Sequence, residues 1–110
     1  MIYFNDESII HYLHMTEEYA RKSSAEEQLE RYLAKANGDI NSLTITELEF
    51  ILFAFIGKIC LMIGEKKASK IIEDIGGRTY DVSIFDHENN NKEDLLSVLK
   101  EIFKVYKEVR

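Results

Sequence analysis

The chain has 110 residues, of which 45% are hydrophobic and 31% are charged, and its formal net charge at pH 7 is -6. This balance excludes an intrinsically disordered chain, and the length favours one compact domain over residues 1–110. Residues 1–45 carry eight acidic side chains against four basic ones, so we expect a negative surface that repels nucleic acid phosphates unless a local basic patch binds them.

The first residues and the single cysteine both favour a cytoplasmic protein. The chain begins without a basic segment followed by an apolar stretch, so no secretory signal is expected. Cys60 is the single cysteine, and it lies in an apolar run where a free cysteine usually behaves as a small buried hydrophobe. Because one cysteine forms no intramolecular disulfide, the sequence favours a reducing compartment.

The N-terminal third is predicted to be mostly helical. Residues 1–4 have the character of a short strand, and apolar side chains at helical spacing then predict a helix over residues 6–22. Two overlapping capping boxes at residues 23–27 indicate that a helix restarts or continues there, since serine and glutamate side chains satisfy free backbone donors at a helix start. The second helical segment is expected to end at Asn37 and Gly38, where glycine accepts the left-handed conformation.

The most apolar part of the chain runs from Phe50 to Gly64. Thr44 and Glu47 form a capping box just ahead of it, so a helix is predicted to begin there. The apolar part would extend about 22 Å as a helix, against about 30 Å of hydrocarbon in a bilayer, and Lys58 interrupts it. We therefore expect a buried central helix and no membrane span.

One face of this central helix carries mostly small residues, which would let another helix approach closely. The stripe consists of Ala54, Gly57, Leu61, Gly64 and Ala68. Because apolar side chains surround nearly the whole helix, either the monomer encircles it or a second copy covers part of it. We favour a homodimer, with self-association through the first four residues of the stripe.

The C-terminal half is predicted to contain two more helices and the clearest strand. A break near Gly64 separates the central helix from a helix over residues 65–75, which two glycines then end. Residues 79–85 alternate as a strand does, and residues 1–4 are the obvious partner. Asn91 is expected to cap a last helix that continues to the C-terminus.

Together these elements predict an α+β fold that is mainly α. Four to five helices are expected around the buried central apolar helix, with one small two-stranded sheet. The central helix should pack against the N-terminal helices and against the C-terminal helix.

No pattern in the chain is strong enough to name a reaction. His11, His14 and Glu18 lie on neighbouring helical turns and could hold zinc with a fourth ligand, but the metal pattern His-Glu-x-x-His is missing. Burial raises the pKa of a thiol and removes its reactivity, which argues against Cys60 as a nucleophile. We therefore expect no enzyme activity, no metal and no cofactor.

The acidic side chains of the N-terminal half suggest a docking surface for a basic partner protein. The residues expected to form this acidic face are Glu17, Glu18, Glu26, Glu27 and Glu30. Solubility alone would also explain them. With the small size of the chain, the acidic face favours a non-catalytic binding protein, a regulatory, immunity or inhibitor-type factor that occupies a surface of another protein.

An alternative rests on the segment Leu43-Thr-Ile-Thr-Glu-Leu-Glu-Phe-Ile-Leu-Phe, which resembles the first-helix entry of winged helix-turn-helix domains. The resemblance covers only this segment and implies a DNA-binding regulator. It would place Lys66, Lys67 and Lys70 on or near a recognition helix, and Arg78 in a wing that contacts phosphates. The chain departs from that pattern after Phe55, where no short polar turn separates two helices.

Overall fold

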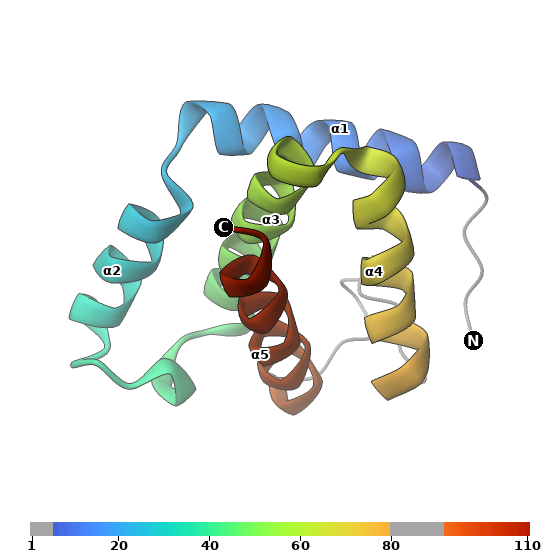
Figure 1. Cartoon of the computed structure of the whole chain (residues 1–110). Helices are drawn as coiled ribbons and strands as arrows, with labels where there is room; N and C mark the ends of the chain where they lie inside the picture. Colours follow the sequence, from blue (N-terminus) through green and yellow to red (C-terminus); the bar gives the residue numbers. More distant parts are fainter. Residues whose placement is uncertain (1–5, 80–91) are drawn as a thin grey trace.

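Helices form all the regular structure in the part of the chain that the structure describes, and Figure 1 shows how they are arranged. The structure is a computed structural model that describes residues 6–79 and 92–110. In chain order the elements are α1 (Asp6–Lys22), α2 (Ala25–Lys35), the 3₁₀-helix η1 (Ile40–Ser42), α3 (Ile45–Ile63), α4 (Glu65–Thr79) and α5 (Lys92–Val109). The radius of gyration is 13.1 Å, about the value expected for a compact chain of this length.

The predicted α+β fold is wrong. Every regular element within residues 6–79 and 92–110 is a helix, and these residues contain no strand. Thr79, the expected first residue of the second strand, is the last residue of α4. The other residues of the two predicted strands, 1–4 and 80–85, lie outside the described residues.

The sequence predicts that Gly76 and Gly77 end the helix that precedes them. In the structure α4 continues through both glycines. Its core face consists of Ala68, Ile72 and Ile75, which are at most 2% exposed and recur at helical spacing. A glycine inside a helix costs only about 1 kcal/mol. The burial of this apolar face therefore outweighs the local preference of the glycine pair for a helix end.

The starts of α2 and α3 follow the capping signals in the sequence. The backbone N–H of Glu27 donates to the Ser24 hydroxyl at 3.2 Å. At α3 both halves of the capping box are present: the Glu47 N–H donates to Thr44 Oγ1 at 3.1 Å, and the Thr44 N–H donates to Glu47 Oε1 at 2.9 Å. These bonds satisfy donors that the first turn of a helix leaves free.

The predicted break between α3 and α4 is also confirmed, at Gly64. This residue caps α3 with a φ of +90°, a backbone conformation that residues other than glycine rarely adopt. α4 begins at the next residue, Glu65. The turn folds α4 back beside α3, and α4 then contacts α1 as well (Figure 1).

α3 is the central helix, as the sequence predicts, and it contacts each of the other four α-helices. In Figure 1, α1 crosses one end of α3, α5 lies along it, and α2 stands to one side. The buried residues of α3 are Leu48, Ile51, Leu52, Ala54, Phe55, Ile56, Gly57, Ile59 and Cys60. Among the described helices, none is both long and apolar enough to cross a membrane.

Aromatic rings join α3 to α5. Phe55 is 2% exposed, and its ring meets Phe103 and Tyr106 edge-on, with centroids 5.0 and 5.1 Å away. Edge-on pairs of this kind contribute about 0.5–1.5 kcal/mol beyond the burial of area. The predicted packing of the central helix against the C-terminal helix is therefore confirmed.

Candidate functional site

A hollow of about 290 Å³ opens where α1 and α2 come together, and we call it the aromatic groove. It is lined by Tyr19, Gln28, Arg31, Tyr32 and Lys35. Phe50 and Phe53 of α3 extend its aromatic surface, because their ring centroids lie 6.5 and 5.6 Å from that of Tyr19. Phe50 is 45% exposed, so this surface offers apolar area to a ligand.

Two polar contacts fix the walls of the aromatic groove. The Tyr19 hydroxyl donates to Oε1 of Gln28 at 2.9 Å, and Gln28 is buried, so the bond fixes α1 against α2. Lys35 Nζ lies 3.7 Å from Glu47 Oε2, which ties the end of α2 to the first turn of α3. These contacts connect α1 to α2 and α2 to α3 at the edge of the aromatic groove.

A second and more open hollow of about 580 Å³ lies next to the groove, with Arg31 in the walls of both. We call it the outer hollow. Its walls consist of Lys22, Ser23, Ser24, Glu27, Glu30, Arg31 and Ala34. Glu27 and Glu30 are exposed and three residues apart on α2, so they present two carboxylates from the same side of the helix.

The structure separates the five glutamates that the sequence placed on one acidic face. Glu17 is buried where α1 meets α4, and Glu26 accepts a hydrogen bond from the Tyr106 hydroxyl of α5. Glu18 is exposed on α1, whereas Glu27 and Glu30 line the outer hollow. Two of the five therefore share one surface, while Glu17 and Glu26 make contacts within the fold.

The basic residues of the DNA-binding alternative all lie on α4. Lys66, Lys67 and Lys70 are exposed in its first two turns. Arg78 belongs to the last turn of the same helix, so the wing predicted to begin there is wrong at that residue, and positions 80–86 lie outside the described residues. α3 continues to Ile63 without the turn that a helix-turn-helix needs after Phe55.

α1 covers part of the small-residue stripe within a single chain. A Cβ atom at Gly57 would lie 2.0 Å from the Thr16 carbonyl oxygen and 3.0 Å from Ala20 Cβ. Ala54 is fully buried, whereas Leu61 is 39% exposed. Packing inside the chain therefore accounts for Ala54 and Gly57, which offer no surface to a second copy. Self-association through the exposed residues Leu61 and Gly64 stays a prediction.

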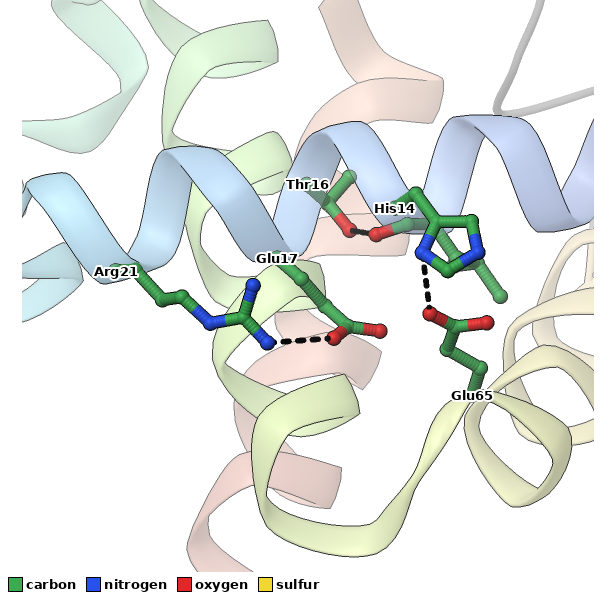
Figure 2. A network of polar contacts seen from close by, with 6 residues as sticks. His14, Thr16, Glu17, Arg21 and Glu65 are labelled. Atoms are coloured by element: carbon green, nitrogen blue, oxygen red, sulfur yellow. Dashed lines mark hydrogen bonds and ion pairs between the residues drawn. The ribbon is translucent and has the colours of Figure 1, made fainter.

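A second cluster of polar side chains lies where α1 meets α4, and Figure 2 shows it from close by. His14 Nδ1 lies 2.8 Å from Glu65 Oε1. One side-chain donor atom from each of His14, Glu17 and Glu65 lies within 4.8 Å of the others. We call these three residues the His14 cluster. Sequence reasoning grouped His14 with His11 and Glu18, which are both exposed and outside the cluster.

Burial raises the pKa of two ionisable groups near this contact, Glu17 and Cys60. Burial raises the pKa of the Glu17 carboxyl, and the neighbouring Glu65 raises it further. Cys60 is 2% exposed, and burial raises the pKa of its thiol to about 12, with the negative charges of Glu17 and Glu65 adding to the effect. The prediction that Cys60 is buried is therefore confirmed.

Sequence reasoning missed Glu65 and the whole aromatic groove. The spacing of His14 and Glu17, three residues apart, places them on one side of a helix and could have indicated the pair. No local sequence pattern indicates that Glu65 lies beside this pair, because the contact depends on how α4 folds back after Gly64.

No family model, curated protein or solved structure is significantly similar to this chain.

Proposed function

We propose that this chain is a non-catalytic protein-binding protein that holds an apolar side chain of a partner protein in the aromatic groove, with basic residues of the same partner segment beside Glu27 and Glu30 of the outer hollow. The observation that carries the proposal is Phe50, a residue that stays 45% exposed while its ring stacks beside that of Tyr19 next to the groove. Aromatic residues and arginine are enriched where proteins bind one another and contribute most of the binding energy there. The groove contains both aromatic side chains and an arginine.

The size of the groove favours an anchoring side chain as its ligand. Its volume of about 290 Å³ is at the lower end of the range for small-molecule pockets, about 300–1,000 Å³. An apolar side chain from a partner would fill it and cover Phe50 at the same time. A large cofactor would not be enclosed.

The net charge of the chain, and the glutamates outside the groove, favour a partner segment that also carries lysine or arginine. The chain has a net charge of -6, and Glu27 and Glu30 are exposed in the neighbouring outer hollow. Aromatic rings such as those of the half-buried Tyr32 and the partly exposed Phe50 attract cations as well. Of the two basic side chains in the groove, Lys35 already lies beside Glu47.

Within this proposal the chain acts by occupying a surface of its partner, as a regulatory, immunity or inhibitor-type factor in the cytoplasm. Cys60, a free cysteine enclosed in the core, supports a reducing compartment.

Affinity capture from cells that make the protein tests the proposal, with Leu61→Ser as a matched control for Phe50→Ser. Both residues are exposed apolar side chains of α3, 45% and 39% exposed, but Leu61 lies about 16 Å further along the helix. We expect wild type and Leu61→Ser to retain the same partner and Phe50→Ser to lose it. Equal retention by all three, or selective loss with Leu61→Ser, would refute the role of the groove.

The DNA-binding alternative rests on the exposed lysines of α4 and is tested in parallel. It predicts binding to duplex DNA that weakens steeply with salt and disappears when Lys66, Lys67 and Lys70 are all replaced by alanine. That result would overturn the protein-binding proposal.

The homodimer is tested separately by light scattering at several protein concentrations. The mass of a single chain at every concentration would refute it.

A further inference from the structure

Glu17 carries a buried oxygen atom that the fold leaves without a partner. The residue is 8% exposed, and its Oε2 atom lies 3.5 Å from Arg21 Nη2. Its Oε1 atom is buried and accepts no hydrogen bond. An unsatisfied buried acceptor of this kind costs about 1–3 kcal/mol, and more when it is charged, so such atoms call for an explanation.

The orphan carboxylate belongs to a group of side chains from two helices. His14 and Glu17 extend from the same side of α1, and Glu65 reaches them from the first turn of α4, as Figure 2 shows. The donor atoms of the three residues lie within 4.8 Å of one another. Glu65 directly follows the turn at Gly64 and is the first residue of α4, so the turn sets its position beside α1.

We propose that His14, Glu17 and Glu65 bind a divalent transition-metal ion, represented by Zn²⁺, which joins α1 to α4. One imidazole nitrogen and two carboxylate oxygens are ligands that zinc accepts, and imidazole favours zinc over Mg²⁺ or Ca²⁺. Bonds of 2.0–2.2 Å in a tetrahedral site place neighbouring ligand atoms about 3.3 Å apart. The cluster, in which two donors lie 2.8 Å apart and all three within 4.8 Å, therefore reaches that spacing through small side-chain movements.

The three ligands differ in their access to solvent, which fits an ion that enters from one side. The side chains of His14 and Glu65 are 62% and 26% exposed, and that of Glu17 is 11% exposed. Glu17 therefore forms the floor of the site and His14 its rim. Three protein ligands leave a fourth position of a tetrahedral ion to water.

A different arrangement would satisfy Glu17 without any ion. The Glu17 carboxyl could keep its proton and share it with Glu65, as neighbouring carboxylates do when both cannot ionise. The two arrangements differ in their response to metal, because only the first binds zinc with a defined stoichiometry.

Calorimetric titration of the chelator-treated protein with Zn²⁺ alone at neutral pH tests the proposal. We expect wild type to bind one ion per chain and to unfold at a higher temperature when zinc is present, since binding to the folded state stabilises it. Glu17→Gln keeps the shape of the side chain and should weaken binding by at least about tenfold, the effect seen for residues that support metal ligands. Glu65→Gln, in a more exposed position, should do the same and provides a second test if the first variant folds poorly.

His11→Ala and Glu18→Gln serve as matched controls on the same helix, because both residues are exposed and outside the cluster. Both should bind zinc as wild type does. The proposal is overturned if wild type binds no zinc, if the controls lose binding while Glu17→Gln and Glu65→Gln keep it, or if all variants bind alike. Co²⁺ in place of Zn²⁺ gives an independent readout, since its visible absorption reports tetrahedral coordination and should disappear in Glu65→Gln.

Discussion

Gly57 of α3 lies so close to Thr16 of α1 that a Cβ atom at position 57 would be 2.0 Å from the Thr16 carbonyl oxygen. Backbone contacts this short require glycine, because no side chain can move aside to relieve them. The contact brings α1 across the central helix. It therefore also sets the position of Tyr19, one helical turn further along α1, at the aromatic groove.

Replacing Gly57 with alanine should lower the free energy of unfolding by about 1–3 kcal/mol, the usual cost of overpacking a core. Helix propensity alone predicts the opposite sign, a gain of about 1 kcal/mol. Denaturant unfolding monitored by circular dichroism measures the difference. A Gly57→Ala variant more stable than wild type would show that α1 does not cross α3 at this residue.

The aromatic contact between α3 and α5 should contribute a large share of the stability. Phe55→Ala removes a ring that is 2% exposed and contacts Phe103 and Tyr106, and we expect a loss of about 3–5 kcal/mol. Phe50→Ala is the matched control, because this residue of the same helix is 45% exposed, and its cost should be well below that of Phe55→Ala. Similar losses in both variants would contradict the burial pattern.

The capping box of α3 should make stability depend on pH in a defined direction. The hydrogen bond from the Thr44 backbone N–H lowers the pKa of the Glu47 carboxyl. A carboxyl with a lowered pKa in the folded state stabilises the fold above its unfolded value of about 4.3, and this contribution is lost as the pH falls through the lower, folded value. Wild type should therefore be more stable than Glu47→Gln at neutral pH, and the difference should disappear in acid.

A companion variant separates the cap from the charge. Thr44→Ala removes the other half of the box and should cost about 0.5–2 kcal/mol. That cost should persist in acid, because the threonine hydroxyl does not titrate. Thermal unfolding over a pH series measures both effects, and a difference between wild type and Glu47→Gln that grows in acid would reverse the predicted sign.

The thiol of Cys60 should be unreactive in the folded protein. It is 2% exposed, and burial raises its pKa to about 12, so little of the reactive thiolate is present at neutral pH. Labelling with a thiol reagent should be slow in buffer and fast in denaturant, with a native rate set by opening of the fold. Rapid labelling of the native protein would show that the contact of α1 with α3 and α4 is open in solution.

Most helix positions could be predicted because their signals are local. The capping box of Thr44 and Glu47, and the glycine at position 64, each depend on neighbours within a few residues, and the structure contains both features. The prediction of a strand over residues 79–85 was wrong at Thr79, which is the last residue of α4; the other positions lie outside the described residues. Its alternation was short, and it competed with the longer helical pattern of Ala68, Ile72 and Ile75, which the core of the fold satisfies.

The candidate sites could not be predicted because they combine distant segments. Tyr19, Gln28 and Phe50 come from three helices, and each alone resembles an ordinary residue of an amphipathic helix. His14 was recognised as a potential ligand but grouped with Glu18 instead of Glu17 and Glu65. The choice depends on which side of α1 faces α4, and that in turn depends on the close contact at Gly57.

The central claim is that a basic segment of another protein binds at the aromatic groove, and photo-crosslinking from position 50 tests it most directly. A photoreactive phenylalanine analogue replaces Phe50 in cells that make the protein, and the same analogue at Leu61 is the control. We predict a crosslink from position 50, but not from position 61, to one protein through a peptide rich in lysine or arginine and carrying an apolar side chain. Crosslinks only to a second copy of the chain, to DNA, or equally from both positions would contradict the claim.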